Sequence, residues 1–230
     1  MYKRQTQANL STVQAALLAA TDATELNTQA GVQTVVTEAI NALAAIEAAA
    51  QTNTATATSP SLSQYDAMGV TGLGGAGQPS LAMINDALND ADVTGAQANT
   101  SGKVQAIVDG FTAILNNATG GSNTVVNATQ ANYAAIGVNG VDTAQEVTLL
   151  GDVIDAKAAT AVDSVTKVQA LADAVQAVMN GNPSEAQLAA LGITGVTSAN
   201  LSTVQAALAA AVDATELNTC LLYTSPSPRD

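Results

Sequence analysis

Histidine and tryptophan are absent from this 230-residue chain, which has one cysteine, one phenylalanine and only 11% charged residues. Without an imidazole, a serine or cysteine nucleophile lacks its usual base, and a single cysteine closes no intramolecular disulfide. The 6 basic residues face 19 acidic ones, so the chain offers no positive surface for nucleic acid. We therefore expect no enzyme, no catalytic, cofactor or metal site, and no nucleic-acid partner.

Long apolar runs are missing as well. The best stretch, residues 39–50, carries Glu47 and is shorter than the ~18 apolar residues of a membrane span, so we expect no span here. The chain is 47% hydrophobic but only 2% aromatic, and much of the apolar fraction is alanine. Alanine buries little area, which predicts units that are marginally stable alone and depend on their neighbours.

What the chain does contain is repetition. Residues 8–28 (ANLSTVQAALLAATDATELNT) return as residues 199–219 with 19 of 21 positions identical. A turn also occurs in three related forms, YDAMGVTGL from Tyr65, YAAIGVNGV from Tyr133 and LAALGITGV from Leu188. A glycine directly after a short apolar-periodic run is the usual helix stop, so each form predicts a short first helix that ends at Gly69, Gly137 or Gly192.

Two further helices are expected after each turn. The second is predicted from about Asn200, from Pro79-Ser80, over residues 9–22, and after Asp142, which forms a capping box with Gln145. The third has apolar residues at helical spacing from Val32 to Ile46, with counterparts from Val104 and Val168. A Val-Gln pair opens all three copies, at 32–33, 104–105 and 168–169.

The expected fold class is therefore all-α: tandem three-helix-bundle repeats of about 64 residues, truncated at both ends. We expect a partial repeat with helices 2 and 3 at 6–50, complete repeats at 60–116 and 128–180, and a partial repeat with helices 1 and 2 at 183–219. The Thr-, Asn- and Gly-rich segments between them are predicted linkers. The apolar stripes of the partial repeats should be less well buried than those of the complete ones.

The two ends differ from the rest. Met1–Gln5 (MYKRQ) and Cys220–Asp230 (CLLYTSPSPRD) resemble translated sequencing-library adapter, which implies that neither string belongs to the native protein. Without them the 6 basic residues fall to 3, the 19 acidic ones to 18, and the net charge becomes −15. The only cysteine and both arginines also disappear.

The order of short helix, Tyr-x-x-x-Gly-Val and two longer helices resembles the GA module, a three-helix bundle found in tandem in bacterial surface proteins. The best match runs from Tyr133-Ala-Ala-Ile-Gly137-Val138 through Ile154 to Lys157 and on to residues 168–173. This chain has fewer lysines and aromatics, a shorter first helix and different linkers. The resemblance therefore implies a surface-displayed helical repeat, and albumin binding, which some of these modules show, is not carried over.

Two motifs have alternative interpretations. Gly72–Gly77 is formally G-x-G-x-x-G, but a dinucleotide site needs a preceding strand, and the related turns contain only GVNG and GITG, so an elongated turn is favoured. Asp90-x-Asp92-x-Thr94 resembles the start of a calcium loop, whose twelfth position should be Glu but is Ser101. We expect no cation site there.

For the remaining polar residues a structural role is favoured over a chemical one. The carboxylates Asp22, Glu25, Glu38, Asp152, Asp155, Asp173, Asp213 and Glu216 are expected on solvated helix faces or at helix ends. None of Lys103, Lys157 and Lys167 lies in a serine–lysine motif. Tyr65 and Tyr133 share a repeat position with Leu188, which favours a core role with the hydroxyl reaching the rim.

These observations favour a fragment of a large secreted or cell-surface repeat protein, an adhesin-like stalk or protein-binding array that contacts extracellular proteins or cell-surface ligands. The main alternative is a structural, self-assembling filament or phage-fibre-like segment without a ligand.

Overall fold

The computed structural model describes residues 7–20, 26–52, 59–121 and 127–210, and these contain ten α-helices and two 3-10 helices. No strand occurs among them, apart from an isolated antiparallel bridge between Thr119 and Ala158. The all-α class is thus confirmed. None of the helices in these ranges is long and apolar enough to cross a membrane.

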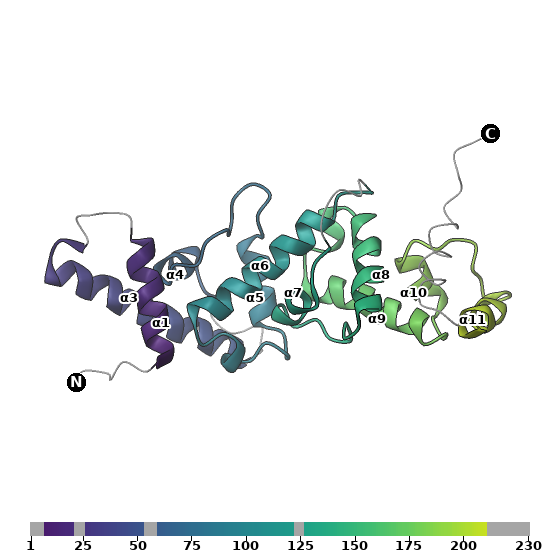
Figure 1. Cartoon of the computed structure of the whole chain (residues 1–230), viewed down its shortest axis with the longest axis horizontal. Helices are drawn as coiled ribbons and strands as arrows, with labels where there is room; N and C mark the ends of the chain where they lie inside the picture. The colour runs from purple at the N-terminus through teal and green to yellow at the C-terminus, as the bar shows by residue number, and fades with distance from the viewer. Residues whose placement is uncertain (1–6, 21–25, 53–58, 122–126, 211–230) are drawn as a thin grey trace. The chain divides into compact units, whose positions relative to one another are not determined.

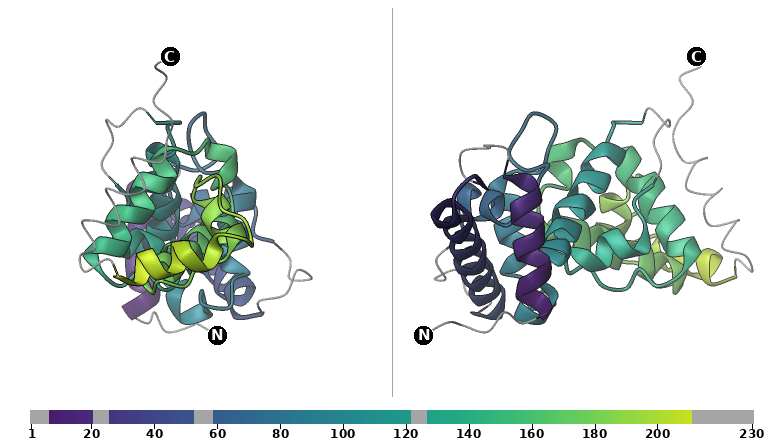
Figure 2. Two further views of the ribbon diagram at one scale, coloured as in Figure 1. Left: turned by 90° about the vertical axis from the view of Figure 1, so that its right-hand side faces the viewer. Right: turned by 60° about the vertical axis from the view of Figure 1, so that its left-hand side comes forward.

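The chain divides into two compact units, and residues 1–115 with 135–137 form the first. Its elements are α1 (Gln7–Ala19), α3 (Gln29–Thr52), α4 (Leu62–Ala67), α5 (Leu81–Leu88), η1 (Gly95–Gln97) and α6 (Ser101–Asn117), whose last two residues belong to the second unit. Helix α3 is central because α1, α4, α5 and η1 all contact it. Its pairing with α1 is visible in Figures 1 and 2.

The second unit comprises residues 116–134 and 138–230. Its elements are α7 (Gln130–Ala135), whose last residue belongs to the first unit, α8 (Ala144–Asp155), η2 (Ala159–Ala161), α9 (Val165–Met179), α10 (Glu185–Ala190) and α11 (Leu201–Ala210). Here α9 takes the central place and contacts both α8 and α10.

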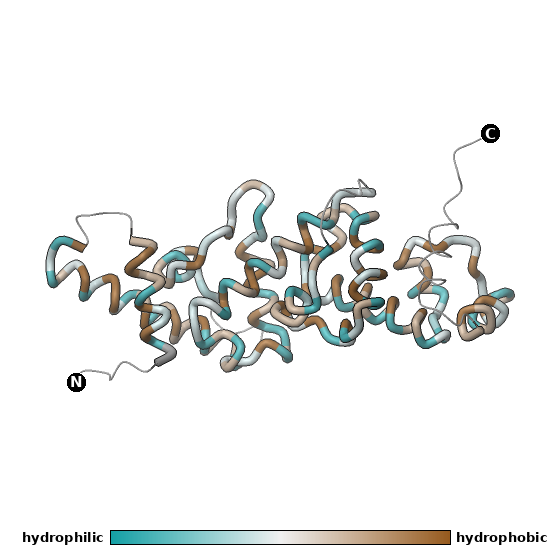
Figure 3. The backbone as a smooth tube through the Cα atoms, in the orientation of Figure 1, coloured by the Kyte–Doolittle hydropathy of each residue, from teal (hydrophilic) through white to brown (hydrophobic). Residues whose placement is uncertain are grey.

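The same order of elements occurs twice, as α4–α5–η1–α6 and as α7–α8–η2–α9. Apolar and polar residues alternate along the helices, as the brown and teal bands of Figure 3 show, because a 3.6-residue period brings every third or fourth side chain to one face. The buried stripe of α6 is Val104, Ile107, Val108, Phe111 and Ile114, and that of α9 is Val168, Leu171, Ala172, Val175 and Val178.

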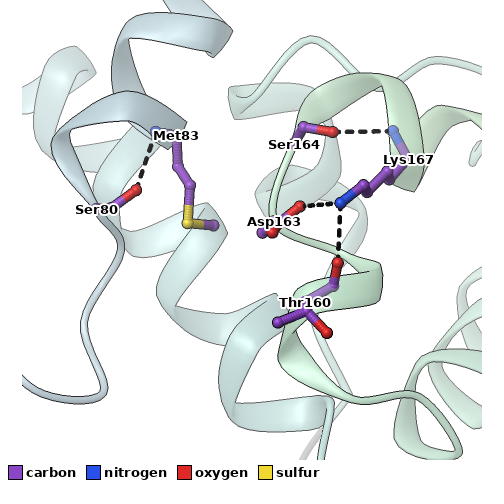
Figure 4. Close-up of polar contacts among 6 residues, drawn as sticks. All are labelled: Ser80, Met83, Thr160, Asp163, Ser164 and Lys167. Atoms are coloured by element: carbon purple, nitrogen blue, oxygen red, sulfur yellow. Dashed lines mark hydrogen bonds and ion pairs between the residues drawn. The ribbon is translucent and has the colours of Figure 1, made fainter.

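Short polar side chains begin the helices. The Ser80 and Ser164 hydroxyls accept hydrogen bonds from the backbone N–H groups of Met83 and Lys167, each at 3.3 Å (Figure 4). Such caps satisfy donors that the first helical turn leaves unpaired. Ser80 was expected at the start of its helix, and the structure confirms it.

The expected capping box of α8 is wrong by one residue. Thr143, not Asp142, is the N-cap, and Glu146, not Gln145, is its partner. The Glu146 carboxylate accepts from the backbone N–H groups of both Asp142 and Thr143, at 2.9 and 2.8 Å. A carboxylate at a helix N-terminus also interacts favourably with the helix dipole, so this pair stabilises the start of α8 more than the neutral Gln145 could.

Helices α1 and α11 have almost the same sequence but different burial. Thr12, Val13 and Ala16 of α1 are buried, whereas α11 has no buried residue although it differs from residues 10–19 only at Ala209. By comparison, α8 buries Leu149, Leu150, Val153 and Ile154. The stripe of the C-terminal segment is thus less buried, as expected, but that of α1 is covered, because α3 packs on it.

Candidate functional site

The most distinctive local structure is the turn that follows each six-residue helix α4, α7 and α10. Gly69, Gly137 and Gly192 have φ values of 75°, 90° and 88°, a left-handed conformation that glycine adopts without steric cost. In each turn the next residue's N–H bonds the carbonyl oxygen five residues back, at 2.9–3.1 Å. This is the Schellman arrangement. The expected helix stops are confirmed.

A glutamine of α6, Gln105, holds the middle of the turn that follows α4. The Gln105 side chain accepts from the Thr71 N–H at 2.9 Å and donates to the Thr71 carbonyl at 3.0 Å. Its Nε2 also donates to Asp109, one helical turn on, at 2.9 Å. The side-chain amide thereby bonds both the N–H and the carbonyl group of one backbone residue, as a neighbouring strand would. We call this arrangement the glutamine clamp.

The second unit repeats the glutamine clamp. Gln169 accepts from the Asn139 N–H at 2.8 Å, donates to the Asn139 carbonyl at 3.2 Å, and donates to Asp173 at 2.7 Å. Sequence reasoning noticed the recurring Val-Gln pair but gave the glutamine no role. The signal that could have identified it is the aspartate four residues later in both copies, since that spacing places the two side chains on one helix face.

The three lysines considered as possible catalytic partners are all held by carbonyl oxygens. Lys103 donates to Ala96 at 2.7 Å, and Lys167 donates to Thr160 at 2.9 Å. Lys167 also forms an ion pair with Asp163 at 2.5 Å (Figure 4). Lys157 donates to the Ala190 carbonyl, at the end of α10, at 2.6 Å. An ammonium group among the unpaired carbonyls of a helix end stabilises that end. These lysines therefore have a structural role.

The G-x-G-x-x-G stretch lies in the loop between α4 and α5, which projects from the helices in Figure 1. A helix precedes it instead of the strand that a dinucleotide site requires. Two of its amides are used within the loop, because Gly74 N–H donates to Pro79 at 2.9 Å and Gly75 N–H donates to Gln78 at 3.0 Å. The structure therefore favours the interpretation as an elongated turn.

The calcium-like residues are similarly engaged. The Asp90 carboxylate accepts from the Asp92 N–H at 2.9 Å, and Thr94 is the N-cap of η1, where it pairs with Gln97. Burial raises the pKa of Asp90 and the Asp92 N–H opposes that rise. Ser101 is buried at the start of α6, where its N–H donates to Thr12 at 3.0 Å. Across the described ranges, no group of three or more acidic, cysteine or histidine side chains could hold a metal ion.

Tyr65, Tyr133 and Leu188 are all buried, which confirms the core interpretation, but the hydroxyl groups do not reach the rim. The Tyr65 hydroxyl donates to Asn85 at 2.7 Å, and Asn85 donates in turn to the Pro60 carbonyl at 3.0 Å. The Tyr133 hydroxyl is buried without a hydrogen-bond partner among the described residues. Burial raises the pKa of both phenols well above the usual value.

One expected surface carboxylate is in fact buried. Asp155, at the end of α8, is only 8% exposed and accepts from the Thr119 hydroxyl at 2.6 Å. The linker after α6 folds back here, since Gly121 N–H donates to the Asp155 carbonyl at 2.7 Å. Glu38 and Asp173 are exposed and Asp152 is half-buried. Asp22, Glu25, Asp213 and Glu216 lie outside the described residues, as do both adapter-like strings.

No protein-family model, curated protein or solved structure matches the chain. Among the residues that the structure describes, the side chains considered for chemistry do not converge on one place, and each of the three lysines and both clamp glutamines bond backbone groups. The arrangement that recurs is the clamped turn, in which a glutamine of α6 or α9 bonds the backbone between the two preceding helices.

Proposed function

We propose that this chain is part of a large secreted or cell-surface protein built from tandem three-helix units of about 64 residues, which acts as a non-catalytic stalk or protein-binding array. The observation that carries the proposal is the glutamine clamp, formed by Gln105 on Thr71 and by Gln169 on Asn139. The same backbone residue of the same turn is held in both copies.

The hydrogen bonds made by the lysines and the clamp glutamines support this function. Lys103, Lys167 and the two clamp glutamines bond turns or helix ends of their own copy, whereas Lys157 bonds the Ala190 carbonyl of the next repeat. A chain of linked repeating modules needs both kinds of contact. The GA-module resemblance supplies the surface location. In a tandem array, weak contacts made by each unit add up, because the second contact forms at a high effective concentration. Extracellular proteins or cell-surface ligands are the proposed partners.

The experiment that tests the function is long-read sequencing of the native locus, followed by detection of the protein on intact cells with an antibody raised against residues 60–180. We expect a signal peptide, many more units with the Gly-x-x-Gly turn and the Val-Gln pair, and labelling of cells that were not permeabilised. A short reading frame in which these units flank a domain with a catalytic site, or labelling only after permeabilisation, would overturn the proposal.

The alternative is a self-assembling structural segment. The burial difference between α1 and α11 favours it, because an unburied helix of nearly the same sequence offers a surface to another chain. Ordered fibres formed by the full-length protein, without adhesion to any extracellular protein, would support this alternative over the binding array.

A further inference from the structure

Two Asn-Gly pairs occur in the chain, at residues 139–140 and 180–181, and both asparagines are exposed. In such a pair the backbone nitrogen of the glycine can attack the side-chain amide carbon of the asparagine, because glycine has no Cβ to block the approach. The nitrogen loses its proton to the solvent and forms a new C–N bond, which closes a succinimide ring. The side-chain amide takes up a proton and leaves as ammonia. Water then opens the ring to aspartate or to isoaspartate.

The pair at 180–181 is held in a way that opposes this reaction. Asn180 is the C-cap of α9, and the Gly181 N–H donates to the Val178 carbonyl at 2.9 Å. The next N–H along the chain also donates to a carbonyl of α9, at 2.9 Å. A Cβ atom at Gly181 would lie 2.9 Å from the Cα of Ala209, so main chain packs closely on this glycine. The nitrogen that must attack is therefore bonded and enclosed.

The pair at 139–140 differs at the attacking nitrogen. Among the described residues, the Gly140 N–H donates no hydrogen bond. The atom nearest to a Cβ at Gly140 would be Nε2 of Gln176, at 3.2 Å, which is the end of a flexible side chain and can move aside. The Asn139 carbonyl accepts from Gln169 at 3.2 Å, which is longer than the 2.8 Å bond to the Asn139 N–H. The Gly140 nitrogen is thus available to attack, whereas the Gly181 nitrogen is not.

Only one copy of the turn contains this reactive pair. The corresponding residues of the other two turns are Thr71-Gly72 and Thr194-Gly195. Threonine has no amide carbon that the glycine nitrogen could attack. The reaction is therefore confined to the turn that follows α7.

The glutamine clamp is sensitive to the product. Gln169 bonds both the N–H and the carbonyl of Asn139, so the clamp needs these two groups at their normal spacing. Isoaspartate inserts a methylene group into the main chain between them, because the chain then runs through the former side chain. It also adds a carboxylate close to Asp173, which bonds the same Nε2 of Gln169. Like charges repel each other there.

We propose that Asn139-Gly140 is a site of spontaneous deamidation, and that formation of isoaspartate at residue 139 opens the glutamine clamp of this copy alone. The reaction consumes water, releases ammonia, and requires neither an enzyme nor an oxidant. The clamp that Gln105 makes on Thr71 stays intact. The chain thus contains one clamped turn that weakens with age and one that does not.

The test follows both Asn-Gly pairs by peptide mapping of the full chain. The folded protein is incubated at mildly alkaline pH, because base removes the proton of the attacking nitrogen, and is then digested at acidic pH. Mass spectrometry measures the mass gained when an amide becomes a carboxylic acid, and a protein-isoaspartate methyltransferase identifies isoaspartate. Residue 139 should react at least about tenfold faster than residue 180, whose reaction must first break backbone hydrogen bonds. In urea the two pairs should react at similar rates, because the fold no longer distinguishes them.

Two variants separate the role of the clamp from a general loss of structure. Asn139→Thr supplies the residue found at Thr71 in the other copy, so it should abolish the reaction in this turn and leave the rate at Asn180 unchanged. Gln169→Ala releases the Asn139 backbone and should accelerate the reaction there by about two- to fivefold, without a change at Asn180. After incubation the wild-type chain should unfold at a lower urea concentration than before, whereas Asn139→Thr should unfold at the same one.

Equal rates at residues 139 and 180 in the folded chain, or no reaction at 139 while the unfolded chain reacts, would overturn the proposal. So would an incubated chain that contains isoaspartate at 139 but unfolds at the same urea concentration as the fresh protein. None of these results depends on the native reading frame or on location at a cell surface. This inference can therefore fail while the proposed function stands.

Discussion

The glutamine clamp predicts a loss of stability on mutation, and another glutamine of the same chain serves as the control. Replacing Gln169 by alanine removes two hydrogen bonds to Asn139 and one to Asp173, whereas replacing Gln33, at the same position of α3, removes only the contact with Thr37. Both changes replace a glutamine within a helix by alanine, Gln33 being exposed and Gln169 half-buried, so the difference in helix propensity cancels between them.

The magnitude follows from the bonds that are lost. A protein hydrogen bond contributes about 0.5–1.5 kcal/mol net, and these lie at the surface, where water can replace them, so we take the lower half of that range. The loss of three such bonds in Gln169→Ala should then lower the free energy of unfolding by about 1.5–3 kcal/mol. Gln33→Ala should cost no more than about 0.5 kcal/mol, the value of one side-chain pair on a helix surface.

The assay is urea unfolding followed by far-ultraviolet circular dichroism, with each variant compared with the wild type at its transition midpoint. Gln105→Ala should behave as Gln169→Ala does, because its three bonds have nearly the same lengths. Equal losses for Gln33→Ala and Gln169→Ala would refute the clamp as a stabilising device.

Three more outcomes are expected. Tyr65→Phe should cost about 1 kcal/mol in urea unfolding because it breaks a hydrogen bond, whereas Tyr133→Phe, whose hydroxyl has no partner among the described residues, should be neutral or stabilising; the reverse order would contradict the structure. Since burial raises both phenol pKa values, the folded chain keeps these protons at a pH at which the unfolded chain has lost them. The contribution of the two tyrosines to stability should therefore be complete below about pH 10 and fall as the pH rises further. Circular dichroism against pH should show a smaller fall in the double Phe variant. Gly69→Ala should cost more than about 2 kcal/mol, because a Cβ there lies 2.6 Å from the Ala15 carbonyl oxygen, and Gly192→Ala, left-handed but open, about 1 kcal/mol; equal thermal shifts would contradict that contact.

Local signals in the sequence were sufficient for much of the fold. The stops at Gly69, Gly137 and Gly192 follow from the conformation that glycine alone adopts easily, and that depends on neighbouring residues only. The start of α8 was missed by one residue because Thr143-Glu146 and Asp142-Gln145 both fit the capping-box spacing. The negative charge of Glu146 at the helix N-terminus favours the Thr143-Glu146 pair, and a pattern of spacing alone takes no account of charge.

Features that depend on distant residues were less predictable. Asp155 is buried because the linker after α6 folds back onto it, and nothing near Asp155 in the sequence indicates that. The clamp joins residues 30 and 34 positions apart. Its members were visible as a recurrent Val-Gln pair, but their partner on the turn is a backbone group, which leaves no trace in the amino-acid sequence.

The most direct test of the central claim, that one clamped helical unit recurs along this chain, is amide hydrogen exchange of Thr71, Asn139 and Thr194 in dilute solution. All three occupy the same position of the same turn, but only the first two donate to a glutamine. We predict slow exchange at Thr71 and Asn139, fast exchange at Thr194, and loss of protection at Asn139 in Gln169→Ala. Equal exchange at all three positions, unaffected by that substitution, would contradict the account.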